Sequence, residues 1–115
     1  MLALALGAAG LPGETVQAHA IIESVTPAAG ATVSGPDVDF LLRFNSRLDH
    51  KRSRLSLRGP DRASRPLPVI LPAADPAALS ARATGLTPGA WVLHWQVLAV
   101  DGHMTRGDIP FSVGK

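Results

Sequence analysis

Three residues of this sequence have the types and the spacing that a metal site requires. Asp101 and His103 lie two positions apart, so in an extended chain both side chains project to the same side. Gly102 between them lets the backbone turn without a clashing Cβ atom. An Asp-Gly turn after a strand is also common in proteins that bind no metal, so the pair alone does not predict a site. The third residue, His19, adds the donors that make a site chemically reasonable.

His19 acquires a second metal-binding group if the chain is cut directly before it. Residues 1–11 form an apolar run that is typical of a secretory signal and shorter than the roughly 20 residues of a membrane span. Val16-Gln17-Ala18 places small or branched residues where a signal peptidase reads them. No Lys or Arg precedes the run, and a loosely packed N-terminal tail is the alternative. We predict a signal peptide over residues 1–18 and a mature domain over residues 19–115.

A terminal His19 would bind a metal ion through both its α-amine and its imidazole, closing a six-membered chelate through Nδ1. The α-amine has a pKa of about 8, low enough for a metal to displace its proton at neutral pH. An oxygen of Asp101 and a nitrogen of His103 complete a set of three nitrogens and one oxygen. Such donors in a tetragonal plane favour copper(II), whereas zinc prefers a tetrahedron. The residues therefore predict one bound Cu(II) per chain.

The other candidate groups are not expected to bind a metal. His94 lies on the strand face opposite the tryptophans and is expected at a surface or on the second sheet face. His50 lies among cations in a polar connection and is expected to be solvated, and Met104 is expected to pack. The chain has no cysteine, which excludes disulfides and thiolate metal sites. It contains no nucleophile elbow, phosphate-binding loop or dinucleotide-binding glycine pattern, so we predict that the protein is not an enzyme.

The composition predicts one small domain built from strands. Hydrophobic residues make up 46% of the 115 residues, and ten prolines and eleven glycines interrupt them, which suits short strands better than long helices. The net charge of +2 and the few aromatic residues do not favour a nucleic-acid partner. The mature chain has no apolar run of membrane length, so we expect it to have no membrane span. We also expect a monomer, although no residue pattern sets the oligomeric state.

Apolar residues alternate over several short segments, as they do in half-buried strands. We expect strands over residues 20–25, 38–44, 54–58, 90–100 and 109–113, an edge strand or irregular segment over 67–71, and a strand or helical turn over 77–83. In the clearest segment, Trp91, Leu93, Trp95 and Val97 share the face that we predict to be buried. About seven strands separated by turns predict an all-β, Ig-like Greek-key sandwich or barrel.

Separated blocks of the mature chain resemble the CopC family of copper-resistance proteins. The family's opening, H-A-x-L-x-x-S-x-P-A-x-G-A, is similar to His19-Ala20-Ile21-Ile22-Glu23-Ser24 followed by Pro27-Ala28-Ala29-Gly30-Ala31. Residues 42–46 and 86–97 are similar to two internal strand segments of the family. The family's ending matches Asp101-Gly102-His103 with Gly107 and Phe111-Ser112-Val113. These blocks occur in the family's order and extend over residues 19–113.

The resemblance implies a seven-stranded periplasmic sandwich or barrel that binds Cu(II) through the terminal His19, Asp101 and His103. It implies a role in copper resistance, homeostasis or delivery, with a CopD-type inner-membrane protein as a candidate partner. Some relatives bind Cu(I) in a methionine-rich loop, but this chain has only two methionines, so that site is not expected. Ser46 stands where relatives often have Glu, so any support from that carboxylate is lost here.

Two other functions stay open at this point. A copper-dependent oxidative enzyme can also use an N-terminal histidine brace, but it needs a broad substrate face with exposed aromatic residues, whereas both tryptophans here are predicted to be buried. A metal-free Ig-like interaction module would show no change in melting temperature with copper, because only a ligand of the native state raises it.

Overall fold

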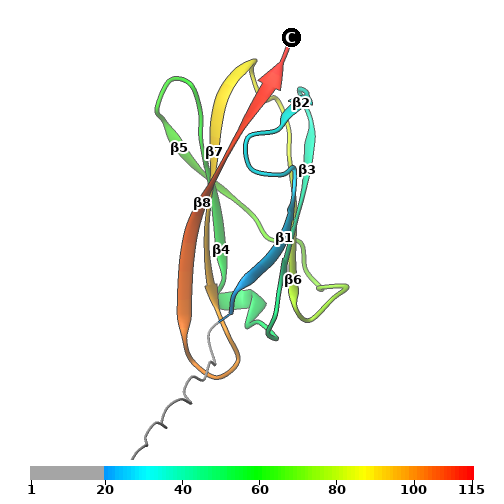
Figure 1. Ribbon diagram of the computed structural model, residues 1–115, viewed down its shortest axis with the longest axis vertical. Coiled ribbons are helices and arrows are strands. Elements are labelled where there is room, and N and C mark those ends of the chain that lie inside the picture. The colour runs from blue at the N-terminus through cyan, green and yellow to red at the C-terminus, as the bar shows by residue number, and fades with distance from the viewer. Residues whose placement is uncertain (1–19) are drawn as a thin grey trace, which may run out of the picture.

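Two β-sheets packed face to face form the fold of residues 20–115, the part of the chain that the computed structural model describes (Figure 1). Its eight strands are β1 (Ile22–Thr26), β2 (Thr32–Ser34), β3 (Val38–Phe44), β4 (Arg54–Arg58), β5 (Ser64–Leu67), β6 (Ala78–Ala83), β7 (Gly89–Leu98) and β8 (Met104–Gly114). One sheet has the order β1–β3–β6 and the other β2–β8–β7–β4–β5. Neighbouring strands are antiparallel except for β2, which pairs parallel to β8. The predicted all-β sandwich is confirmed.

The long central strand β7 supplies much of the contact between the sheets. Trp91, Leu93, Trp95 and Val97 point inward and are 8%, 0%, 7% and 0% exposed, as the alternation predicted. Phe44 of β3 meets the ring of Trp95 edge to face, with 5.3 Å between the ring centroids. Burial contributes roughly 25 cal/mol per Å² of apolar surface, and such an aromatic contact adds about 0.5–1.5 kcal/mol. The end of β7 is therefore a rigid base for the turn that follows.

The strand boundaries match the sequence where alternation is unbroken and differ where it is not. Strands β3 and β4 have the predicted limits, and residues 78–83 form a strand. The edge strand β5 covers Ser64–Leu67, earlier than the expected segment 67–71. It ends directly before Pro68, because proline has no N–H to donate to the neighbouring strand. Strand β8 begins at Met104, five residues before its predicted start, because it pairs with β7 along its length. The three-residue strand β2 was not predicted.

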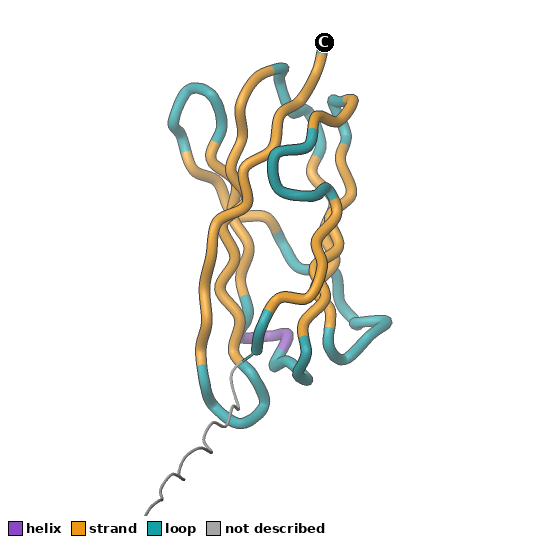
Figure 2. The backbone as a smooth tube through the Cα atoms, in the orientation of Figure 1, coloured by secondary structure: helices purple, strands orange, loops and turns teal. Residues whose placement is uncertain are grey.

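One end of the sandwich gathers the β7–β8 turn, the first described residues and a short 3₁₀ helix, η2 (His50–Arg52) (Figure 2). The segment before η2 is tied to β7, because the backbone N–H of Asp49 donates a 2.8 Å hydrogen bond to the carbonyl of Leu98. The buried hydroxyl of Ser53 accepts a 3.1 Å hydrogen bond from the N–H of Leu98. These bonds fix the base of the turn that carries Asp101 and His103.

Residues 20–115 contain no helix with the length and apolar character needed to cross a membrane.

Candidate metal centre

The turn between β7 and β8 brings Asp101 and His103 side by side. Its backbone is closed by hydrogen bonds from the N–H of Gly102 to the carbonyl of Ala99 (2.9 Å) and from the N–H of Ala99 to the carbonyl of His103 (2.8 Å). Gly102 has a φ of 96°, a conformation that glycine adopts more readily than other residues, so it stabilises the turn.

The carboxylate of Asp101 organises this turn from within. Its Oδ1 atom accepts a 3.0 Å hydrogen bond from the backbone N–H of His103 and lies 3.3 Å from His103 Nδ1. Both side chains are accessible, with exposed fractions of 36% for Asp101 and 52% for His103. The two predicted ligands are thus adjacent in the turn at one end of the sandwich.

The first described residue, Ala20, is fixed beside the same turn. Ala20 is 1% exposed and belongs to the hydrophobic core. Its carbonyl accepts a 2.9 Å hydrogen bond from the hydroxyl of Thr105, two positions after His103. Ile21 is held by Asn45, whose Oδ1 accepts from the Ile21 N–H at 2.7 Å and whose own N–H donates to the Ile21 carbonyl at 3.0 Å. The start of the described chain therefore lies between the end of β3 and the beginning of β8.

The third predicted ligand, His19, and the predicted signal peptide lie outside the described residues. Within residues 20–115, no three histidine, aspartate or glutamate side chains come together as a metal-binding group. The described part therefore brings together two of the three predicted ligands and fixes the residue that follows the third. Carboxylate and imidazole donors of this kind suit copper(II) once another nitrogen ligand is present.

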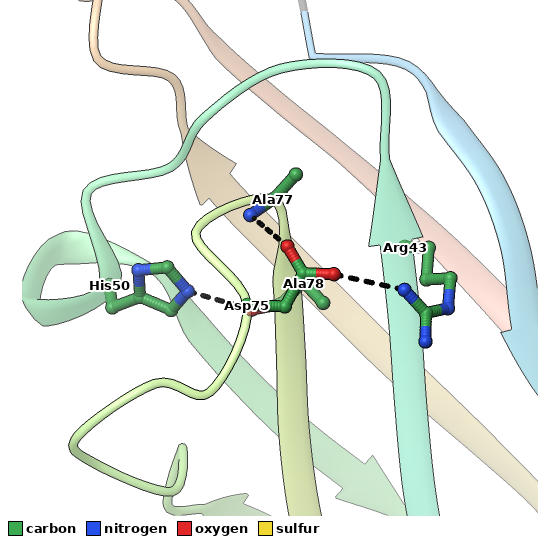
Figure 3. A network of polar contacts seen from close by, with 5 residues as sticks. All are labelled: Arg43, His50, Asp75, Ala77 and Ala78. Carbon is green, nitrogen blue, oxygen red and sulfur yellow. Dashed lines mark hydrogen bonds and ion pairs between the residues drawn. The ribbon is translucent and has the colours of Figure 1, made fainter.

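His50 differs from the solvated side chain that its cationic neighbours predicted. It is half buried, and its Nε2 atom lies 2.7 Å from the carbonyl oxygen of Ala78 (Figure 3). The same strand end is braced by Asp75, which accepts from the N–H of Ala77 at 2.8 Å and from Arg43 at 2.9 Å. His50 therefore joins η2 to β6 and has a structural role.

His94 and Met104 lie on the outer face of the five-stranded sheet. His94 Nδ1 is 2.5 Å from Asp108 Oδ1, as a cross-strand pair between β7 and β8. Met104 was expected to pack, but it is 44% exposed, because its position on β8 faces away from the core.

Thr105 and Asn45 are the residues of this region to which the sequence assigned no role. Their hydrogen bonds join positions 85 and 24 residues apart, so no local pattern could reveal them. Thr105 is one position beyond the exposed Met104, so it faces the interior side of β8. This alternation is the only sequence signal that Thr105 points inward.

Comparison with known proteins shows the family and the fold of the chain. The chain is 33% identical over 122 residues to protein YobA of Escherichia coli strain K12, covering 96% of this chain and 91% of that protein. The crystal structure of CopC from Methylosinus trichosporium OB3b has a TM-score of 0.77 and 25% identity, covering 84% of this chain and 94% of the other.

A second solved structure, PcoC, a methionine-rich copper resistance protein from Escherichia coli, has a TM-score of 0.65 and 26% identity, covering 84% of this chain and 99% of the other. The family model of the CopC domain matches residues 22–114, from the first strand to the end of the last. The resemblance found in the sequence is confirmed: the chain belongs to the CopC domain family.

Proposed function

We propose that the mature protein is a periplasmic copper carrier or buffer that binds one Cu(II) ion through His19, Asp101 and His103. In this proposal copper is cargo, and the protein serves copper resistance, homeostasis or delivery to a CopD-type membrane partner. The single observation that carries the proposal is the fixed position of Ala20 beside the β7–β8 turn.

The covalent chain limits where His19 can lie. Its Cα atom is about 3.8 Å from that of Ala20, the spacing across a trans peptide bond. Ala20 is bonded to Thr105, and Thr105 follows His103 by two positions. This tether supports the proposal that a terminal His19 meets Asp101 and His103 at the β7–β8 turn through its imidazole and α-amine.

The donor chemistry supports copper(II) in preference to other cargo. An α-amine, two imidazoles and a carboxylate supply borderline nitrogen donors and one oxygen, which suit tetragonal Cu(II). The accessibility of Asp101 and His103 suits exchange with another protein. The resemblance to CopC and to a copper resistance protein points the same way.

The alternative of a copper-dependent oxidative enzyme is less well supported. Both tryptophans are buried between the sheets, so they do not form an exposed aromatic platform for a polymeric substrate. The metal-free interaction module is the hypothesis that a binding experiment must exclude.

The test compares copper affinity between a protein that begins at His19 and one that carries an additional Met before it. We expect one Cu(II) per chain in the first, with an electron paramagnetic resonance spectrum of nitrogen-rich tetragonal copper. The added Met, Asp101→Asn and His103→Ala should each weaken binding by at least about tenfold, or 1.4 kcal/mol. His94→Asn, which removes an exposed histidine elsewhere, is the control and should leave the affinity unchanged.

Equal affinity of the two N-terminal forms would disprove the amine chelate. Mass spectrometry of the exported protein provides a second check, because an N-terminus at any position other than His19 also contradicts the proposal.

A further inference from the structure

The outer face of the five-stranded sheet carries a row of polar side chains unrelated to the proposed copper site. Arg54 of β4, Gln96 of β7 and Arg106 of β8 are aligned across three neighbouring strands. The next row toward the other end of the sheet consists of Ser56, His94 and Asp108. Both rows alternate with buried positions such as Leu55 and Trp95, so they share the outward face.

Positive charge on this face is not balanced within the sheet. Strands β4, β7 and β8 contain one acidic residue, Asp108, and its Oδ1 atom is hydrogen-bonded to Nδ1 of His94. In the described part of the chain, the arginine ion pairs join Arg43 to Asp75, Arg52 to Asp49, and Arg82 to both Asp37 and Asp39. Arg54 and Arg106 therefore lack a carboxylate partner among residues 20–115.

A hollow of about 310 Å³ lies on this face between β4, β5 and β7. It is lined by Arg54, Leu55, Ser56, Ser64, Arg65, Pro66, His94 and Gln96. Polar groups of Arg54, Ser56, Ser64, His94 and Gln96 thus lie beside the larger apolar part of the lining, with the edge strand β5 on one side. Arg106 is outside the hollow but next to Gln96, so its charge adds to the positive potential there.

We propose that this hollow binds a phosphate group, either as free phosphate or as a phosphate monoester. Guanidinium–phosphate hydrogen bonds are charge-assisted and can be bidentate, which favours Arg54 as the main contact. The hydroxyls of Ser56 and Ser64 and the Gln96 amide can each donate to the remaining oxygens. Asp108 fixes the His94 ring through Nδ1 and leaves Nε2 as the ring nitrogen that can meet a P–OH or a phosphate oxygen.

The β-sheet keeps the backbone beneath the proposed phosphate site rigid. Arg54, Ser56, His94 and Gln96 come from two strands whose pairing runs without interruption from Arg54 to Arg58. Their inward neighbours are buried, so the backbone of the floor is fixed before a ligand arrives. The site therefore needs only side-chain movement to bind.

The experiment is an amide nuclear magnetic resonance titration of the metal-free protein beginning at His19, with inorganic phosphate as the probe at constant ionic strength. Metal-free protein is used because phosphate itself binds copper. We expect saturable shifts confined to residues 54–56, 64–65 and 94–96, and no such shifts with an equivalent chloride titration.

Variants separate a specific site from general charge attraction. Arg54→Gln should weaken phosphate binding by about tenfold, the effect of losing a charge-assisted pair. Lys51→Gln is the matched control, because it removes the same charge from an exposed position in η2, outside the lining of the hollow. A linear, non-saturating titration, or an equal loss in the two variants, would overturn the proposal.

A parallel titration with glycerol phosphate distinguishes the two sources of the phosphate group. Tighter binding than that of inorganic phosphate assigns the site to an ester, and weaker binding assigns it to the free ion. Unchanged backbone spectra of Arg54→Gln outside the hollow show that the variant is folded.

Discussion

The Thr105 hydroxyl donates a 2.9 Å hydrogen bond to the carbonyl of Ala20, and so joins the first described residue to the beginning of the last strand. The contact spans 85 positions of sequence. This hydrogen bond holds Ala20 next to the turn that contains Asp101 and His103. The proposed copper site therefore depends on tertiary structure as well as on its ligands.

Thr105→Val tests that dependence with a side chain of nearly the same shape. Loss of the hydrogen bond leaves the Ala20 carbonyl without this donor, so the free energy of unfolding should fall by about 1 kcal/mol. Copper affinity should fall as well, because residue 20 is held less firmly. Urea denaturation and copper titration measure the two effects. Thr84→Val, at an exposed threonine, is the control, and an unchanged affinity in Thr105→Val would contradict the role given to this contact.

Gly102→Ala should distort the turn that aligns the two described ligands. A φ of 96° is unfavourable for alanine and should cost about 1–2 kcal/mol of stability. Copper binding should weaken because Asp101 and His103 separate. Gly85→Ala offers a matched control, since Gly85 also has a positive φ of 70° with no neighbouring atom within 4 Å of an added Cβ. It should lower the melting temperature comparably and leave copper affinity intact; equal copper affinities in the two variants would refute the prediction.

Gly107→Ala should destabilise the sandwich itself. A Cβ atom at this position would lie 2.6 Å from Cζ2 of Trp95, well inside van der Waals contact. Because Trp95 is packed in the core, relief requires movement of the indole or of β8, at a cost of about 1–3 kcal/mol. Thermal unfolding measures this cost. Gly114→Ala, whose added Cβ would be no closer than 3.6 Å to any neighbour, should be nearly neutral, and similar melting temperatures for the two variants would argue against the clash.

Ser53→Ala should show how much one buried hydroxyl contributes to the free energy of unfolding. Ser53 is 5% exposed; its hydroxyl donates to the Asp49 carbonyl at 2.8 Å and accepts from the Leu98 N–H at 3.1 Å. Alanine would leave a buried N–H without this acceptor, which costs about 1–3 kcal/mol. Urea denaturation measures the loss against Ser34→Ala, an exposed serine. Amide exchange at Leu98 should accelerate in Ser53→Ala, and unchanged exchange would show that water replaces the hydroxyl.

The strands that could be predicted are those in which one face is buried and the other exposed. Alternation defines β3 and β4 because every second side chain enters the core. It fails in the first half of β8, where Gly107 replaces an inward side chain to make room for Trp95. It also fails in β2, which has only three residues and depends on its parallel partner for definition.

In the candidate site too, local spacing could be predicted from the sequence, whereas long-range contacts could not. The two-residue spacing of Asp101 and His103 predicted that they would lie side by side, and they do. The bonds of Thr105 and Asn45 connect distant segments, and only the folded chain brings these partners together. The role of His19 as a ligand stays a prediction from its place in the sequence.

The burial of Ala20 separates folding from the proposed binding of copper. Ala20 fills its place in the interior of residues 20–115, so we expect their core to form whether or not residues 1–18 have been removed. The proposed ligand set, in contrast, exists only after the peptide bond before His19 is cut. A precursor would then be a folded sandwich whose metal site lacks the α-amine ligand. Cleavage before His19, after export, would complete the site and allow copper to bind.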